Sequence, residues 1–383
     1  MALLGGVATT PATAAEAGPA WTFEATYTVD AMGPAAGGAS RSGRIADNLD
    51  LIAELDLGRA LGWQGATLHG YLLSNQGGAP NDLAGTLQGI DNIEVARQGV
   101  RLYELWVDAP VGERGSVLLG LYDINSEFYA NEAAGLLISP SFGIGSELAA
   151  TGPNGPSIFP STALAVRGAY AFEGGHLRGA VVNAHAGVPG DPHGLDLDFD
   201  DGALFIGEAG LDLALGKLAV GAWRYSDDQD DIREVTSSGG PVRQTAQGAY
   251  LLGERVFAGA PGDRRRTVTG FFRVGVSDGA TSPFKGGWQA GVLVEHVFDS
   301  RPDSAFSVGV QQGLLSARMR DNLRDGGVDA ADAESGIEFT WSDRLTDRIT
   351  LQPDLQLIFD AGGDRKADAV LIAGLRLTID LLP

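Results

Sequence analysis

The 383-residue chain lacks cysteine and lacks any long hydrophobic run. The absence of cysteine excludes disulfides, thiolate metal ligands and thiol nucleophiles. It is also common in bacterial envelope proteins, which fold in an oxidising compartment. A transmembrane helix needs about 18 consecutive apolar residues. Because the chain has no such stretch, we exclude a helical membrane span.

Basic residues are also scarce, since 27 Lys and Arg stand against 49 Asp and Glu and the formal net charge is -22. Nucleic acid is bound through basic surfaces, so we expect no nucleic-acid partner. The 56 glycines follow no collagen-like period, and 44% hydrophobic residues argue against disorder. The chain therefore folds, and it contains no linker that would divide it.

The first twenty residues resemble an export leader. Ala2 to Ala8 form a weak apolar core, and Ala12-Thr13-Ala14 resembles a small-residue cleavage site. No Lys or Arg precedes the core, which departs from the usual pattern. We expect residues 1–20 to be a signal peptide or a flexible leader, and residues 21–383 to form one domain.

The main signal in the rest of the chain is a period of two. Apolar and polar residues alternate strictly from Trp21 to Asp30, and Leu49, Leu51 and Leu55 alternate with acidic residues. Successive side chains of a strand point to opposite faces, so these segments are amphipathic strands. Sixteen such segments begin near Trp21, Ala46, Ala66, Val100, Ser116, Ala163, Leu177, Ala203, Lys217, Ala246, Thr267, Gly287, Ala305, Glu334, Arg348 and Ala369.

The connections between the segments alternate in length. Segments 58–65, 110–115, 173–176, 215–216 and 343–347 are short, whereas 74–99, 123–162, 186–202 and 227–245 are long. Short periplasmic turns and long extracellular loops are typical of bacterial outer-membrane barrels. We therefore predict an all-β fold, a transmembrane antiparallel β-barrel of about 16 strands. Hydrocarbon penalises carboxylates, so the acidic face of each strand lines a water-filled channel.

Longer phrases of the sequence carry a family resemblance. They are DLAGTLQGIDNIE (82–94), RLYELW (101–106), GLYDINSEF (120–128), SFGIG (141–145) and TGPNGPSIFP (151–160), followed by residues 187–192, 221–223, 351–356 and 371–377. In this order they resemble the carbohydrate-selective porin family (porin B) of bacterial outer membranes. The resemblance covers nearly the whole chain beyond Trp21.

The resemblance implies a sixteen-stranded barrel, long loops folded inward, and passive diffusion of glucose-like sugars across the outer membrane. It also implies contact with outer-membrane lipid and with the barrel assembly machinery during biogenesis. Such barrels usually end in an aromatic residue that this machinery reads, but here the end is Leu381-Leu382-Pro383. That departure puts the usual assembly signal in doubt, not the fold.

Sugars are neutral and rich in hydroxyls, so a channel for them needs hydrogen-bonding groups and aromatic rings at a narrow point. Loop 123–162 is the longest connection and is the expected constriction loop, because long structureless loops are commonly functional. We expect the pore to be lined by Glu54, Asp56, Glu104, Trp106, Asp108, Asp123, Asn125, Glu127, Arg167 and Arg224.

Each of these residues also has a simpler, purely structural interpretation. The carboxylates can solvate a wet wall, Trp106 can belong to an interfacial girdle, and each arginine can pair with a neighbouring acid. A general or cation-selective porin of the same architecture, or a soluble sugar-binding β-protein, stays open as an alternative. The dense acids at 196–201 and 227–231 resemble calcium ligands, although outer loops often carry such acids simply to stay solvated.

An enzyme is the remaining alternative. No serine stands with a histidine and a carboxylate at a recognisable spacing, although triads assemble across the sequence. We therefore expect a channel and not an enzyme, with no catalytic residues, no cofactor and no resident metal.

Overall fold

The computed structural model describes residues 19–188, 191, 194–259 and 266–382. The expected leader at 1–20 lies almost wholly outside the described residues. The remainder forms a closed antiparallel barrel in which β1 pairs with both β2 and β18. Each other barrel strand pairs with its neighbours in chain order, except that β9 pairs with β12.

The barrel strands are β1 (Trp21–Ala36), β2 (Arg44–Asp56), β3 (Thr67–Gly77), β4 (Gly99–Val111), β5 (Gly115–Tyr122), β6 (Ala163–Phe172), β7 (Gly175–Asn183), β8 (Ala203–Leu213), β9 (Gly216–Tyr225), β12 (Gln247–Ala258), β13 (Thr267–Ser277), β14 (Phe284–Glu295), β15 (Ala305–Leu315), β16 (Ala333–Thr346), β17 (Ile349–Phe359) and β18 (Val370–Asp380).

The sixteen predicted strands are therefore confirmed. The largest error in a predicted start is three residues, since Gly287 was expected where β14 begins at Phe284. The period-two pattern is strong because one face of each strand meets an apolar surface while the other faces polar groups.

The sequence did not reveal an additional hairpin or the short helices. β10 (Gln229–Val235) and β11 (Pro241–Gln244) form a separate two-stranded sheet inside a predicted loop. The helical segments are α1 (Leu57–Leu61), α2 (Asn81–Ala84), η1 (Ile124–Ser126), η2 (Glu132–Ala134), η3 (Pro140–Phe142), α3 (Ser146–Ala149), α4 (Ala317–Asp325) and η4 (Ala361–Gly363). No helix in the described part of the chain is long and apolar enough to cross a membrane.

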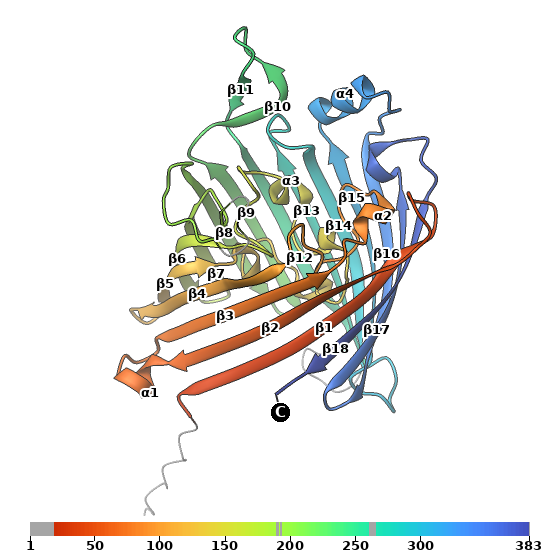
Figure 1. Ribbon diagram of the computed structural model, residues 1–383. Helices are drawn as coiled ribbons and strands as arrows, with labels where there is room; N and C mark the ends of the chain where they lie inside the picture. The colour runs from red at the N-terminus through yellow and green to blue at the C-terminus, as the bar shows by residue number, and fades with distance from the viewer. Residues whose placement is uncertain (1–18, 189–190, 192–193, 260–265, 383) are drawn as a thin grey trace, which may run out of the picture.

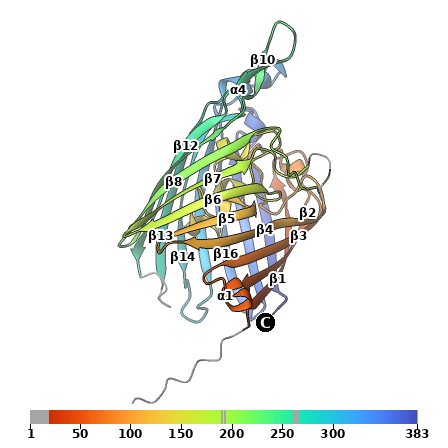
Figure 2. The same cartoon turned by 90° about the vertical axis from the view of Figure 1, so that its left-hand side faces the viewer.

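The long connections gather at one end of the barrel. In Figure 1 this end is at the top, and the short turns lie at the bottom, near the C-terminus. The β10–β11 hairpin and α4 project from the loop end (Figure 2). They contact each other, because Arg233 Nη1 lies 2.8 Å from Asp325 Oδ2 and Asn322 Nδ2 donates to Ile232 O.

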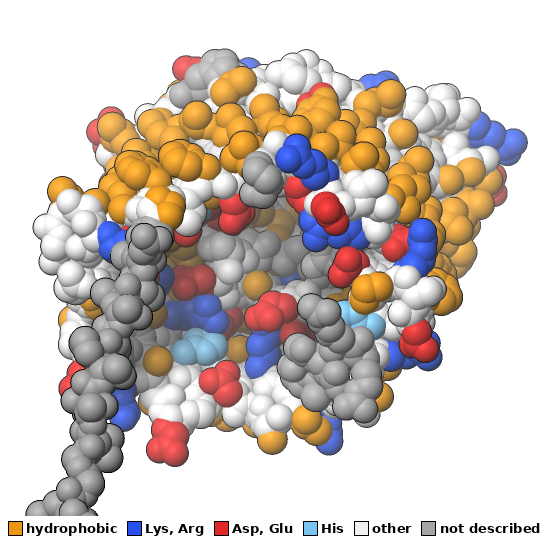
Figure 3. Space-filling model, turned by 90° about the horizontal axis from the view of Figure 1, so that it is seen from below, with side chains coloured by type: hydrophobic (Ala, Val, Ile, Leu, Met, Phe, Trp, Pro, Cys, Tyr) orange, Lys and Arg blue, Asp and Glu red, His pale blue; other side chains and the backbone are white. Residues whose placement is uncertain are grey.

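The two faces of the wall differ in chemistry as the alternation predicts. In β8, Phe205 and Leu211 are exposed on the outside, whereas Ile206 and Glu208 are buried on the inside. Seen from the turn end, hydrophobic side chains cover the outside, and acidic, basic and histidine side chains surround the hollow (Figure 3).

The buried core lies between the wall and the loops, because two long loops fold into the barrel. Ile124, Phe128 and Leu148 of loop 123–162 share one hydrophobic cluster with Trp223 and Leu252 of the inner wall. A second cluster joins Ile90 of the β3–β4 loop to wall residues of β1, β17 and β18. The open part of the lumen is therefore bordered by loop as well as by strand.

Candidate functional site

The inner face of β2 to β6 carries a dense group of aromatic rings and carboxylates. Its geometry begins with an irregularity in β4. Tyr71 pairs with Glu104 and Leu72 pairs with Leu102, so Tyr103 is the extra residue of a β-bulge. A bulge turns two successive side chains to one face. Tyr103 and Glu104 are consequently both buried inside the barrel.

Glu104 is the centre of this group. Its Oε1 accepts hydrogen bonds from Trp106 Nε1 at 3.2 Å and from the Asp123 amide at 3.0 Å. Its Oε2 lies 3.7 Å from His69 Nε2. The His69 and Trp106 rings are stacked, with centroids 4.5 Å apart and planes 5° from parallel. We call Glu54, His69, Glu104, Trp106 and Asp123 the wall cluster.

A glycine makes room for Trp106. Gly120 of β5 lies opposite Trp106 in the strand register and has a φ of 146°. A Cβ at this position would lie 2.8 Å from Trp106 Cβ. Any larger residue would therefore displace Trp106 from the wall cluster.

Glu54 completes the wall cluster from β2. Its Oε1 lies 3.2 Å from His69 Nδ1, and its side chain keeps about half of its exposure. Asp56, two residues further along, has a different environment. It accepts a hydrogen bond from the Arg59 amide and caps α1 at the turn end. Asp56 is the last residue of β2 and shares the face of Glu54, so its place in the pore lining stays a prediction.

Arg167 of β6 is held by acids on two neighbouring elements. Its Nε lies 2.8 Å from Glu127 Oε2, and its Nη2 lies 3.3 Å from Asp108 Oδ2. Nη1 donates to Ser116 Oγ at 2.6 Å, and Glu127 also accepts from the Tyr122 hydroxyl. These three charged groups line the wall, but they largely satisfy one another.

Asp123 and Asn125 shape the start of loop 123–162. Asp123 Oδ1 accepts from the Asn125 amide at 2.7 Å and caps η1, and Oδ2 accepts from the Tyr103 hydroxyl at 2.6 Å. Asn125 Nδ2 donates to Gly143 O within the same loop. Asp123 therefore belongs to the wall cluster, whereas Asn125 stabilises the fold of the loop.

Burial raises the pKa of the Asp123 carboxyl from its ordinary value of 3.8 to about 6, although the hydrogen bonds from Tyr103 and from the Asn125 amide lower it. The folded state thus favours the protonated form. The contribution of the protonated Asp123 carboxyl to the free energy of unfolding is complete below about pH 4 and is lost as the pH rises through 6.

We expect the free energy of unfolding of the native chain, relative to Asp123→Asn, to fall by at most ~3 kcal/mol between pH 4 and pH 7. Guanidinium unfolding in detergent, followed by tryptophan fluorescence at several pH values, measures this difference. The exposed loop variant Asp200→Asn is the matched control. A difference between native chain and Asp123→Asn that stays constant with pH would contradict the raised pKa.

Loop 123–162 crosses to the opposite wall, where Arg273 of β13 anchors it. Arg273 Nη1 donates to Tyr129 O and Gly143 O at 3.0 and 2.8 Å, and Nη2 donates to Ser141 O at 2.7 Å. The guanidinium also lies 5.0 Å from the centre of the Tyr129 ring. Since Arg273 is only 2% exposed, its charge is compensated almost entirely by the loop.

Buried carboxylates of the wall hold the same loop through its amides. Glu338 accepts from the amides of Ile138 and Ser139, and Glu208 accepts from the Tyr129 amide at 3.1 Å. The Tyr129 ring stacks on Tyr250 with centroids 3.9 Å apart. These contacts fix the inward path of the loop.

A second long loop, 78–98, also folds into the barrel. Glu334 accepts from the amides of Leu87 and Gln88, and Arg376 donates to Asn92 Oδ1 at 2.6 Å. Arg376 also binds Asp30 at 2.5 Å. The length of this connection is visible in the sequence, but the wall residues Glu334 and Arg376 that hold the loop are not.

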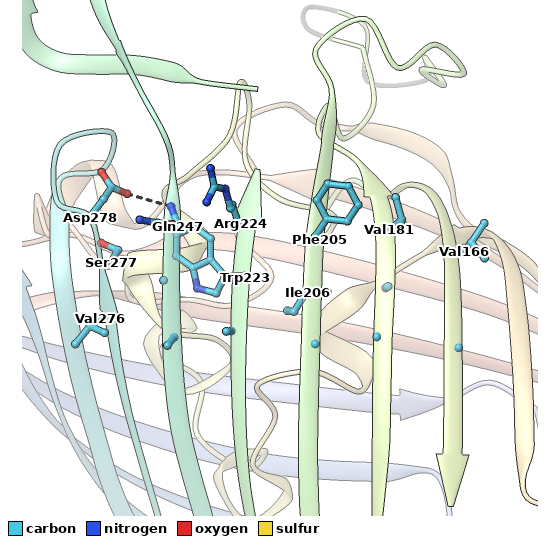
Figure 4. A pocket seen from close by; sticks show the side chains of 17 residues that line it. Val166, Val181, Phe205, Ile206, Trp223, Arg224, Gln247, Val276, Ser277 and Asp278 are labelled. Carbon is cyan, nitrogen blue, oxygen red and sulfur yellow. Dashed lines mark hydrogen bonds between the residues drawn. The ribbon is translucent and has the colours of Figure 1, made fainter. Parts of the chain in front are cut away.

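Arg224 is a predicted pore residue whose position is wrong. In β9 the side chains of Trp223 and Tyr225 are buried inside, so Arg224 lies with exposed Val220 on the outer face. It borders an outer groove together with Phe205 (Figure 4). Alternate residues of β9 face inward, and Trp223 and Tyr225 take these inner positions. Arg224 between them therefore faces outward.

The acidic loop segments do not form a cation site in the structure. Within the described residues, no group of three or more His, Asp and Glu side chains could hold a metal ion. Asp231 instead binds Arg318, and Asp230 binds Arg243 at 2.8 Å. Calcium binding at 196–201 and 227–231 stays a prediction.

The wall cluster can bind a hydroxyl-rich solute. Carboxylates accept hydrogen bonds from hydroxyls, and aromatic faces pack against apolar ring surfaces. The rings form a continuous ladder, with centroids 6.2 Å apart for Phe159 and Tyr103, 4.9 Å for Tyr103 and Tyr71, and 6.4 Å for Tyr71 and His69. Trp106, which is stacked on His69, is the last ring of the ladder.

Comparisons with known proteins agree with this architecture. Residues 40–381 match the model of the family described as "Carbohydrate-selective porin, OprB family". The chain is 24% identical to Porin B of Pseudomonas aeruginosa over 166 residues, which are 40% of this chain and 37% of that protein. The chain thus spans less than half the length of this curated relative.

Solved structures share the fold. The high pH structure of Pseudomonas putida OprB superposes with a TM-score of 0.82 at 20% identity, covering 94% of each chain. The low pH structure of the same protein gives a TM-score of 0.59 at 16% identity, covering 94% of this chain and 93% of that one.

Proposed function

Because the chain belongs to the carbohydrate-selective porin family, we propose that it is a passive channel through which small, glucose-like sugars diffuse across the bacterial outer membrane into the periplasm. The apolar outer face contacts outer-membrane lipid, and the barrel assembly machinery inserts the chain during biogenesis. The chain acts as a channel and not as an enzyme.

The observation that carries this proposal is the combination of rings and acceptors in the wall cluster. Trp106 and His69 supply a flat surface, and Glu54 and Glu104 supply acceptors beside it. This combination suits a neutral sugar, which has an apolar ring face and hydroxyl donors. A simple ion pore needs charge but no stacked rings.

Loop 123–162 supports the proposal as the constriction. Its anchors lie on β8, β13 and β16, so it crosses the lumen at a depth fixed by buried hydrogen bonds. A rigid loop presents a binding surface without an ordering cost. The pore therefore narrows beside the wall cluster, and each sugar passes within reach of it.

Binding must be weak for diffusion to continue. A site with millimolar affinity corresponds to about -4 kcal/mol, which is enough to favour sugar and little enough to release it. No energy source is required, because the sugar moves down its own gradient.

A general or cation-selective porin is the second candidate, and the carboxylates of the wall favour it. Arg167 neutralises Glu127 and part of Asp108, whereas Glu54 retains partial exposure and has only a histidine beside it. Unneutralised acids attract cations into a pore. The zero-current potential in a salt gradient measures this preference.

The decisive experiment is single-channel recording of the refolded chain in a planar bilayer with glucose titrated in. We expect discrete open channels whose current is blocked by glucose in a saturable way. Open channels indifferent to sugar, with a strong cation preference, would support the second candidate instead. Well-folded protein that forms no channels would refute both.

A further inference from the structure

A cavity of about 450 Å³ with both polar and apolar lining lies at the loop end of the barrel, away from the wall cluster. Parts of the three loops 78–98, 123–162 and 184–202 meet around it. We call it the mouth cavity and define it by Glu94, Arg97, Arg101, Asn154, Phe159 and Ser161. Clefts of roughly 300–1,000 Å³ with a few convergent polar groups are the usual size for small ligands.

Arg101 of β4 leaves one hydrogen-bond donor unused in this cavity. Its Nη1 donates to Pro160 O at 3.1 Å and its Nη2 donates to Arg97 O at 2.8 Å. Its Nε is buried without a hydrogen-bond partner, and the residue is only 7% exposed. A buried, unpaired N–H is costly, so a rotation of the Arg101 side chain that brings Nε to a ligand oxygen in the cavity gains free energy.

Phe159 connects the mouth cavity to the wall cluster. Its ring is partly exposed and contacts the Tyr103 ring edge-on, with centroids 6.2 Å apart. Tyr103 is the second ring of the ladder that continues through Tyr71 and His69 to Trp106. β3 and β4 run along the barrel wall, so the ladder leads from the loop end towards the turn end.

The charges around the cavity favour a neutral ligand. Glu94 lies in the same lining as Arg101, and one of its oxygens accepts from the Asn81 amide at 2.8 Å. A neutral sugar can donate to Glu94 and accept from Arg101, because each hydroxyl does both. An anionic sugar would meet the Glu94 carboxylate and a chain with a net charge of -22.

We propose that the mouth cavity is an entrance subsite for one neutral sugar unit, which Arg101 and Phe159 bind before it moves on to the wall cluster. This inference rests on the proposed sugar-porin function. The subsite holds sugar on the loop side close to the constriction, so that sugar from this side reaches the constriction faster.

The test is kinetic, because an entrance subsite changes how fast sugar arrives from one side. Glucose is added to one chamber at a time, and current fluctuations give its association and dissociation rates. Protease in one chamber, which cuts the projecting β10–β11 hairpin, identifies the loop side. In Phe159→Leu we expect association from the loop side to slow about fivefold. Association from the turn side should stay within about twofold of the native rate.

Arg101→Lys provides a second variant, since it keeps the charge but removes the guanidinium, with Nε and the two donors to Pro160 O and Arg97 O. We expect the same one-sided slowing. Phe205→Leu on the outer face is the matched control and should match the native chain. Unchanged open-channel conductance in each variant shows that the barrel and its loops are intact.

The outcomes separate the two proposals. If glucose does not block the native channel from either side, the proposed function fails. If glucose blocks the native channel, but both variants take it up from the loop side at the native rate, the entrance subsite is refuted. Glucuronate that associates from the loop side faster than glucose would refute the preference for a neutral sugar.

Discussion

Replacing Trp106 by alanine should raise the glucose concentration that half-blocks the channel about tenfold. The substitution removes the ring that stacks on His69 and the N–H that binds Glu104. Aromatic pairs contribute roughly 0.5–1.5 kcal/mol beyond their buried area, and 1.4 kcal/mol is a factor of ten in affinity. Titration of glucose against single-channel current measures the change.

Trp288→Ala is the matched control for this experiment. Trp288 lies on the outer face of β14, because its neighbour Gln289 is buried inside beside Arg273. We expect this variant to keep the native half-block. In Trp106→Phe, the glucose concentration that half-blocks the channel should lie between the values for Trp106→Ala and for the native chain, since phenylalanine keeps a ring but has no N–H donor. Equal block by glucose in Trp106→Ala and the native chain would exclude the wall cluster as the binding site.

Replacing Arg273 by methionine should free loop 123–162 from the opposite wall. The change leaves the carbonyls of Tyr129, Ser141 and Gly143 without their buried partner. Removing one partner of a buried charged network typically costs about 3–5 kcal/mol. We expect a larger and noisier single-channel conductance, weaker block by glucose, and faster proteolysis within 123–162.

The barrel itself should survive this change, because its closure depends on backbone pairing between strands, which the substitution of the Arg273 side chain leaves in place. Arg255→Met, an exposed arginine on the outer face of β12, serves as the control and should behave as the native chain. Native conductance and native protease resistance in Arg273→Met would mean that the contacts of Glu338 and Glu208 hold the loop without it.

The sequence predicted which residues belong to the site better than it predicted the contacts between them. Glu104, Trp106 and Asp108 share a face of one strand, and alternation is enough to show that. The bulge at Tyr103 left no trace in the pattern, yet it turns Tyr103 inward beside Glu104. His69 was also missed, because a single histidine between Leu68 and Gly70 gives no sign of the tryptophan stacked on it.

The positions of Asp56 and Arg224 in the structure have local causes. Asp56 continues the acidic face of β2 in the sequence, but the strand ends and the carboxylate caps α1. Arg224 stands between Trp223 and Tyr225, and either parity is chemically plausible at the end of a strand. The packing of Trp223 and Tyr225 against loop 123–162 selects the parity that turns the arginine outward.

The sequence alone determined the sixteen strands, the polarity of their faces and the alternation of long and short connections. These features depend on neighbours along the chain and on the contrast between an apolar and a polar environment, and both are visible in a period of two. The tertiary structure decided where the loops bind inside the barrel. Arg273 meets Ser141, and Arg101 meets Pro160, only because closure of the barrel brings distant strands and loops together. No pattern among residues that are close in the sequence predicts these contacts.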